Sequence, residues 1–347
     1  MDIWIVIGFL GALIAFGLWH GRGVHTIDDF SLPARKVGFF TLVCALTAGA
    51  IGGGFSSGNA AEVFQSGVGN ILILSGFSLG QILMGRLFLP RVRPLEGVSS
   101  PGELMRSAYG KPGQVITGLA SALLCGGVIG AQISAIGAVF NVLLDIPFAM
   151  GVLIGLFVLL VYATAGGIGA VITAEVVECL LLLAGMPLLL FFSLRHIGGV
   201  EALVREVPPE FWNVFNGRGP VALISLFLTM IIGEALMPST IQRFLSGKDR
   251  KTIAGATVAS GVITLPLFII TGLVGLCALV DNPAGEPALA MASMILKALP
   301  VGVKGVVVTA VLAIAMSSAD AVLSCASIGI VNDVLRPLGA LRSGRAG

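Results

Sequence analysis

Residues 44–67, CALTAGAIGGGFSSGNAAEVFQSG, are apolar enough to cross a membrane but contain many residues that weaken a helix. Three consecutive glycines occupy positions 52–54, near the middle of this stretch. Glycine destabilises a helix by about 1 kcal/mol relative to alanine, and unpaired backbone groups in hydrocarbon are costlier still. The stretch therefore predicts either a transmembrane helix broken where it faces a polar cavity, or a helix whose glycines allow close packing.

The composition predicts an all-α polytopic membrane protein. The 347 residues are 56% hydrophobic and only 11% charged, whereas soluble domains are about 25% charged. The net charge is +2, and no basic cluster is interleaved with aromatic residues, so we expect a lipid bilayer and no nucleic acid as partner. All five cysteines lie in apolar segments and are expected to be buried small hydrophobes rather than a disulfide or metal framework.

Hydropathy predicts about nine spanning segments, each near the ~20 residues that a bilayer requires. They are 3–19, 39–64, 71–89, 113–144, 147–165, 171–194, 221–241, 252–279 and 301–331. The fourth and the last exceed 30 residues, so they must tilt, bend or extend past the bilayer. The first lacks the features of a cleavable signal peptide and is expected to be retained, and 286–299 is expected to be a short helix outside the membrane.

The basic residues predict the orientation in the plasma membrane. Of the 20 Lys and Arg residues, 15 lie at the end of segment three or in the loops after segments one, three, seven and nine. Excess positive charge marks the cytoplasmic side, so the N-terminus is expected outside and the C-terminus inside. The uncharged AGGIG sequence at 165–169 is expected to be a cytoplasmic loop between segments five and six.

A second interrupted segment, LTMIIGEALMPSTIQRF at 228–244, contains Gly233, Glu234 and Pro238. Proline removes a hydrogen bond from a helix. Interrupted helices at corresponding positions of two halves are typical of inverted-repeat transporters, which bind ion and substrate at the repeat interface. Unwound turns leave carbonyl oxygens free to ligate a cation, while the N-terminus of a half-helix favours an anion.

The last segment carries side-chain oxygens in the sequence AIAMSSADAVLSCAS at 313–327. Ser317 and Ser318 are adjacent, and Asp320 follows two residues later. Sodium is a hard cation that prefers oxygen ligands, so two hydroxyls and a few freed carbonyls would suit it. Alternatively, the serines bond only to their own helix or to a neighbouring one.

Five ordered stretches resemble motifs of the sodium:solute symporter family, which includes proline, pantothenate and sugar cotransporters. They are GRGVHTIDDFSLPARKVG (21–38), TAGAIGGGFSSGNAAEVFQSGVG (47–69), VYATAGGIGAVITAEVVE (161–178), STIQRFLSGKD (239–249) and VLAIAMSSADAVLSCASIGIVND (311–333). The resemblance implies a leucine-transporter-like inverted-repeat fold in one transmembrane domain, preceded by an extra helix at 1–20. The first five-helix repeat would span 38–195 and a partial second repeat 220–332. Family members continue with further spans, so the second repeat is expected to be incomplete, with a polar tail at 333–347.

The resemblance also implies a sodium site between the first broken helix and the Met-Ser-Ser helix. Its ligands would be the carbonyls of Ala50, Gly53 and Ile314 and the hydroxyls of Ser317 and Ser318. Sodium would be a transported ion and not a prosthetic group.

The implied substrate site lies beside the glycine break, at Gly52, Gly54, Phe55 and Gly58, and faces Glu234 of the second interrupted segment. An intramembrane carboxylate such as Glu234 could bind a cationic group or carry a proton.

Three further carboxylates are expected to take part in coupling. Where the family usually has Thr-Asp and, three residues later, Gln, this chain has Ala174, Glu175 and Glu178. Asp320 is the third acidic residue in these segments.

The function implied is sodium-coupled import of a small organic solute by alternating access. Proton coupling through Glu234, Glu175 or Glu178 is the near alternative, and a non-transporting sensor or scaffold is a further one. An enzyme is not expected, because the three histidines form no HExxH motif or Cys/His cluster. The sequence leaves open the solute, the stoichiometry and the oligomeric state.

Overall fold

The computed structural model describes residues 2–21, 37–91, 98, 100–233 and 236–339. Within these ranges the chain is almost entirely helical and forms no β-strand, as expected for an all-α membrane protein. Residues 22–36 of the predicted motif at 21–38 and residues 340–347 of the predicted polar tail lie outside the described residues.

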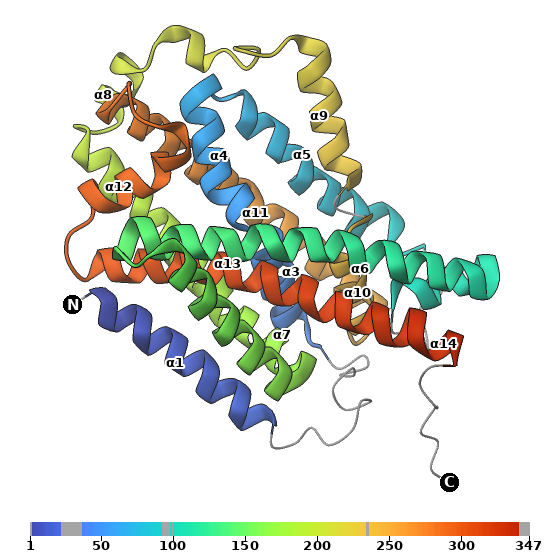
Figure 1. The fold of residues 1–347 in the computed structure, drawn as a ribbon. Coiled ribbons are helices and arrows are strands. Elements are labelled where there is room, and N and C mark those ends of the chain that lie inside the picture. The colour runs from blue at the N-terminus through green and yellow to red at the C-terminus, as the bar shows by residue number, and fades with distance from the viewer. Residues whose placement is uncertain (1, 22–36, 92–97, 99, 234–235, 340–347) are drawn as a thin grey trace.

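Figure 1 shows the order of the helices along the chain. Those of the first half are α1 (Asp2–Gly21), α3 (Phe39–Ala50), α4 (Gly53–Ser66), α5 (Gly69–Leu83), the π-helix η1 (Met84–Phe88), α6 (Pro101–Leu144) and α7 (Phe148–His196). Those of the second half are α8 (Val200–Glu206), the 3-10 helix η2 (Pro209–Trp212), α9 (Pro220–Gly233), α10 (Pro238–Ser246), α11 (Arg250–Asp281), the 3-10 helix η4 (Pro287–Leu289), α12 (Ala290–Ala298), α13 (Val303–Ile328), the π-helix η5 (Gly329–Leu335) and α14 (Arg336–Leu338).

The number of candidate spans, judged by length and apolar composition, agrees with the nine expected when the bent pair is counted as one. In the described ranges eight helices are long and apolar enough to cross a membrane, and the bent pair α3 and α4 makes a ninth. Two of these spans, 148–165 and 171–196, lie within α7, whose backbone stays helical through the AGGIG sequence where a loop was expected. Helical hydrogen bonding therefore continues across this run despite its glycines.

The longest predicted segments are bent or extended, as their length requires. Helix α6 begins at Pro101, twelve residues before the predicted start, because Ser100 accepts a hydrogen bond from the Glu103 amide and caps it. A kink follows at Gly110, whose φ of 66° favours glycine. Helix α13 continues through η5 into α14 and forms a candidate span of 36 residues.

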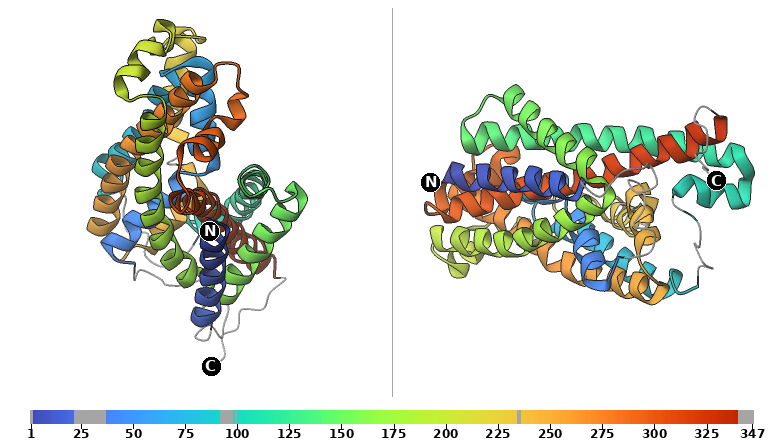
Figure 2. Two further views of the ribbon diagram at one scale, coloured as in Figure 1. Left: turned by 90° about the vertical axis from the view of Figure 1, so that its left-hand side faces the viewer. Right: turned by 90° about the horizontal axis from the view of Figure 1, so that it is seen from below.

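Helix α13 lies at the centre of the bundle, packed between α6 and α7 (Figures 1 and 2). In the most apolar stretch of the α13 span, 89% of the residues are buried, whereas 22% are buried in that of α1, which lies at the periphery. Helix α1 packs along α7 and α13, and the Asp2 carboxylate accepts hydrogen bonds from the Gly302 and Gly305 amides at the start of α13. The short helix α12 packs against α11, and its position outside the membrane stays a prediction.

Candidate functional site

The first broken helix is present as predicted. Helix α3 ends at Ala50, α4 begins at Gly53, and their axes differ by 49°. Between them Ile51 has φ −99° and ψ 77°, and Gly52 is extended with φ −76° and ψ 175°. Because the last carbonyls of a helix have no intrahelical partner, the end of α3 presents free oxygens inside the bundle.

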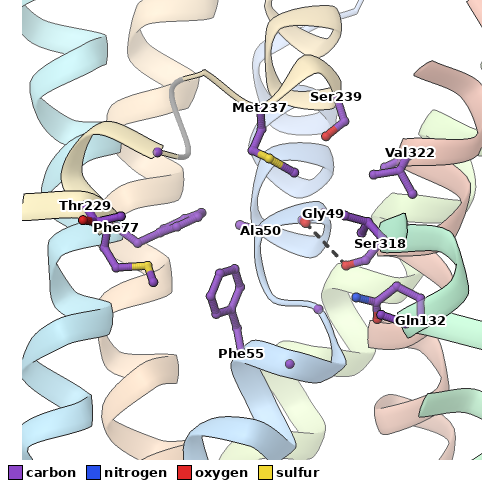
Figure 3. A pocket seen from close by; sticks show the side chains of 17 residues that line it. Gly49, Ala50, Phe55, Phe77, Gln132, Thr229, Met237, Ser239, Ser318 and Val322 are labelled. Carbon is purple, nitrogen blue, oxygen red and sulfur yellow. Dashed lines mark hydrogen bonds between the residues drawn. The ribbon is translucent and has the colours of Figure 1, made fainter. Parts of the chain in front are cut away.

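The two adjacent serines of α13 lie against this helix end. The Ser317 hydroxyl is 3.0 Å from both the Ala48 and the Ile314 carbonyl oxygens, and the Ser318 hydroxyl is 3.4 Å from the Gly49 carbonyl (Figure 3). Both serines are buried. The serines thus bond to a neighbouring helix as well as to their own, and that neighbour is the broken one.

The close approach of α13 explains one glycine of the triplet. A Cβ atom at Gly52 would lie 2.9 Å from the Ser318 Oγ atom and 3.0 Å from the Gln132 Nε2 atom. A larger residue at position 52 would therefore displace these polar groups from the break.

The predicted sodium ligands lie around this junction, with Ala50 and Gly53 flanking the break and Ile314, Ser317 and Ser318 on α13. The two α3 carbonyls that the serines contact, those of Ala48 and Gly49, were not among the predicted ligands, whereas the Ile314 carbonyl was. The glycines that end α3 were a signal for them, because the last four carbonyls of a helix have no partner within that helix.

The second interruption is also present. Helix α9 ends at Gly233 and α10 begins at Pro238, which occupies the first helical position, where its missing N–H has no consequence. Met237, just before it, is extended with φ −63° and ψ 126°. Glu234, the predicted partner of a cationic substrate group, lies outside the described residues.

A cavity of about 420 Å³ opens between the two interruptions, within the size range typical of small-ligand sites. Figure 3 shows Ser318 and Gln132 on one side, Phe77 and Thr229 on the other, and Phe55 between them. The lining residues are Gly49, Ala50, Gly52, Gly54, Phe55, Phe77, Val128, Ala131, Gln132, Thr229, Met230, Gly233, Met237, Ser239, Ser318, Ala321 and Val322. Of the four described residues predicted to bind substrate, Gly52, Gly54 and Phe55 line the cavity and Gly58 does not.

Comparisons with known proteins agree with this architecture. A sequence model of the Sodium:solute symporter family matches residues 30–339. The chain belongs to the sodium:solute symporter family. It is 24% identical to Sodium/glucose cotransporter 1 of Mus musculus over 96% of this chain and 57% of that protein, and 25% identical to the High-affinity proline transporter PutP of Bacillus subtilis over 76% and 58%.

A solved structure of a transporter has the same fold. A substrate-bound, outward-open Na+-coupled sialic acid symporter superposes with a TM-score of 0.85 and 19% identity, over 99% of this chain and 75% of that one. The predicted leucine-transporter-like architecture is thereby confirmed. The chain spans just over half the length of the curated relatives it matches.

Helix α6 of this symporter-family chain contributes one polar group that the sequence did not single out. The Gly53 amide donates a hydrogen bond of 3.1 Å to Gln132 Oε1, which links α6 to the start of α4. Figure 3 shows the Gln132 amide pointing toward the break. An amide side chain near the middle of the predicted span 113–144 was the available signal.

Three buried carboxylates lie beside the serine junction, between α7, α10 and α13. Glu175 is ion-paired to Arg243, and Asp320 accepts a hydrogen bond from the Tyr162 hydroxyl. Neither oxygen of Glu178 has a hydrogen-bond partner among the described residues, although the side chain is only 1% exposed. The residues expected to take part in coupling are therefore brought together, and Glu178 is the least compensated of them.

Other features agree with the sequence or add to it. All five cysteines are buried, as expected. Phe55, Phe77 and Phe268 form a cluster of edge-to-face rings with centroids 5.6 to 6.2 Å apart, which fixes the apolar side of the cavity. No group of three or more His, Cys, Asp or Glu residues in the described ranges is arranged to hold a metal ion.

Proposed function

We propose that the protein is a sodium-coupled symporter that moves a small organic solute across the plasma membrane by alternating access. One observation carries the proposal: the Ser317 and Ser318 hydroxyls meet the end of the broken α3 helix at the edge of a cavity between two interrupted helices. Interrupted helices around a central site are the arrangement that transporters of this kind use.

We assign sodium to the junction of α3, α4 and α13. The ligands would be the carbonyls of Ala50, Gly53 and Ile314 and the hydroxyls of Ser317 and Ser318. The chemistry suits an alkali ion, since every proposed donor atom is a neutral oxygen and the two hydroxyls can turn from their carbonyl partners toward an ion.

The driving force is sufficient for accumulation. One sodium ion moving through 100 mV supplies about 2.3 kcal/mol, and tenfold accumulation of a solute requires about 1.4 kcal/mol. One ion per solute therefore suffices for a solute without net charge, whereas a solute with one negative charge would depend on the sodium concentration gradient, because the two charges cancel across the membrane. Because Ser318 lines the cavity as well, ion and solute would be neighbours, which gives each a direct effect on the binding of the other.

The proposed organisation places helix 1–20 outside the repeats, the first repeat at 38–195 and the described part of a second at 220–332. Each repeat then has an interrupted helix near its start, α3 with α4 and α9 with α10. We further propose that the N-terminus is extracellular and the C-terminus cytoplasmic.

The orientation can be tested with single cysteines at exposed positions, since the native cysteines are buried. Glu201→Cys should react with a membrane-impermeant maleimide in intact cells, and Lys248→Cys should react only after permeabilisation. The opposite pattern would reverse the proposed orientation.

The sodium site is tested by the double substitution Ser317→Ala with Ser318→Ala. Sodium, but not potassium, should raise the melting temperature of the purified wild-type protein, and the double variant should lose this response and sodium-driven uptake. As a control, Ser324→Ala with Ser327→Ala removes two hydroxyls from the same helix and should keep the sodium response of the melting temperature and sodium-driven uptake. Unchanged sodium dependence in the first variant would refute the site.

Proton coupling is the second candidate, and the Glu178 carboxyl, which has no hydrogen-bond partner among the described residues, favours it. A buried carboxylate without a partner is so unfavourable that the group binds a proton or a cation instead. Uptake in proteoliposomes with a pH gradient and no sodium, compared between wild type and Glu178→Gln, separates the candidates. Uptake driven by the pH gradient alone in wild type would favour the proton.

A further inference from the structure

We propose that the solute is a small organic acid with one carboxylate and an apolar body. The inference rests on the proposed function, because it takes the cavity between the interrupted helices as the substrate site. It follows from the uneven distribution of polar groups along the cavity. Gln132, Ser318 and the Gly54 backbone lie toward its polar end and Phe55, Phe77 and Met230 toward its apolar end. The remaining polar side chains of the described lining are Thr229 and Ser239.

The apolar end offers almost nothing to a hydroxyl group. The edges and faces of Phe55 and Phe77 form its surface, and Phe268 holds both rings in place. Thr229 is the polar side chain on this side, and its hydroxyl already donates to the Ser225 carbonyl at 2.8 Å. A polyhydroxylated solute would leave several of its hydroxyls without partners, whereas an aliphatic or aromatic body would fill the space.

The polar end offers hydrogen-bond donors. Gln132 Oε1 is occupied by the Gly53 amide, so the group it has left for a solute is its NH₂. Gly54 is the second residue of the 14-residue helix α4, where an amide has no intrahelical acceptor, and no atom would lie within 4 Å of a Cβ there. With the sodium ion proposed beside Ser318, these groups favour a negatively charged head group.

The described lining carries no charged side chain, which argues against a second charge on the solute. An ammonium group would require an acceptor of negative charge, and the described carboxylates nearest the junction lie outside the lining, with Glu175 bound to Arg243. On the described lining, a monocarboxylate is therefore favoured over a zwitterionic amino acid; Glu234, the predicted partner of a cationic group, lies outside the described residues.

The experiment measures thermal stabilisation of the purified full chain in sodium by a matched set of probes. The set contains propanoate, hexanoate and 3-phenylpropanoate, together with 3-phenylpropanamide, phenylalanine and glucose. At least one carboxylate should stabilise the protein in sodium and not in potassium, with an apparent affinity about tenfold or more above its amide, amino-acid and sugar counterparts.

Other rankings of the probes would overturn the inference. Equal binding of the amide would remove the carboxylate from the proposal, and stronger binding of phenylalanine or glucose would replace the solute class. Stabilisation by sodium alone, with no response to any carboxylate, would also overturn the inference while leaving the proposed function intact. If sodium itself has no effect, the proposed function fails first.

A pair of variants ties the carboxylate to the polar end. Gln132→Leu should weaken binding of the best carboxylate about tenfold or more and leave the binding of its amide and of sodium unchanged within twofold. Ser134→Ala, on the exposed face of the same helix, should leave the binding of the carboxylate, its amide and sodium unchanged. Equal losses for carboxylate and amide in Gln132→Leu would assign Gln132 a structural role only.

Discussion

Arg243 of α10 and Glu175 of α7 form an ion pair inside the helix bundle, where both side chains are less than 10% exposed. The guanidinium also packs against α3, since a Cβ atom at Gly49 would lie 2.8 Å from Arg243 Nη2. The ion pair joins α10 to α7, and its guanidinium packs against α3, the first half of the other interrupted helix.

Removal of either partner of this pair should destabilise the protein strongly. A buried charge left alone costs about 3–5 kcal/mol, whereas replacement of both partners by apolar residues is often close to neutral. We expect Glu175→Met and Arg243→Met each to lower the melting temperature of the protein in detergent by much more than the double variant does.

The exposed pair Arg205 and Glu206 provides the control. Exposed ion pairs contribute about 0–1 kcal/mol, so Glu206→Gln should change the melting temperature little. A double variant that is as unstable as the worse single variant would show that the buried pair contributes through more than its charges.

Gly52→Ala should reduce sodium affinity without unfolding the protein. The new methyl group would lie 2.9 Å from Ser318 Oγ, and this hydroxyl can rotate away, so the contact is relieved at the expense of the proposed ligand. We expect the midpoint of the sodium-dependent rise in melting temperature to shift to about tenfold higher sodium or more. Gly58→Ala is the matched control, because nothing lies within 4 Å of its Cβ position. Equal shifts in both variants would contradict the assignment of Ser318.

The features that the sequence predicted are those with local signals. Glycine and proline runs mark where α3 stops and where α10 begins, and apolar runs locate all nine spans. The AGGIG sequence shows the limit of such signals, since glycines there do not end the helix. The nature of the site as a junction of α3 and α13 came from the family resemblance and not from residue spacing.

The features that the sequence missed depend on contacts between distant parts of the chain. The Ala48 and Gly49 carbonyls are identified only because α13, 269 residues later, packs against them. Gln132 meets Gly53 across 79 residues, and Arg243 meets Glu175 across 68. No pattern in any one segment contains these pairings, because helix packing determines them.

Asp249 should stabilise the first turn of α11 only above acidic pH. Its carboxylate accepts hydrogen bonds from the Thr252 amide at 2.8 Å and the Thr252 hydroxyl at 3.1 Å. The hydrogen bond from the backbone amide is the main reason that the pKa of Asp249 lies below the usual value. A pKa that is lower in the folded state means that the stabilisation is complete above the unfolded pKa, about 3.9, and is lost as the pH falls through the folded one. Hydrogen exchange of the Thr252 amide should therefore show normal protection at neutral pH and reduced protection in acid. Asp249→Ala should lack that pH dependence, and a wild-type protection factor that stays constant into the acid range would refute the cap.

Glu178 and Glu175 lie three residues apart on α7, yet their substitution should affect stability in opposite directions. Glu175 has Arg243 as partner, whereas both oxygens of Glu178 lack one among the described side chains and backbone. Glu178→Met replaces an uncompensated buried carboxyl by an apolar group of similar size, so the melting temperature should stay the same or rise, unlike that of Glu175→Met. A residue that weakens the fold is retained where function requires it, so uptake by Glu178→Met should fall sharply or lose its dependence on pH. A variant that is both more stable and fully active over pH 6–8 would leave Glu178 without a role in coupling.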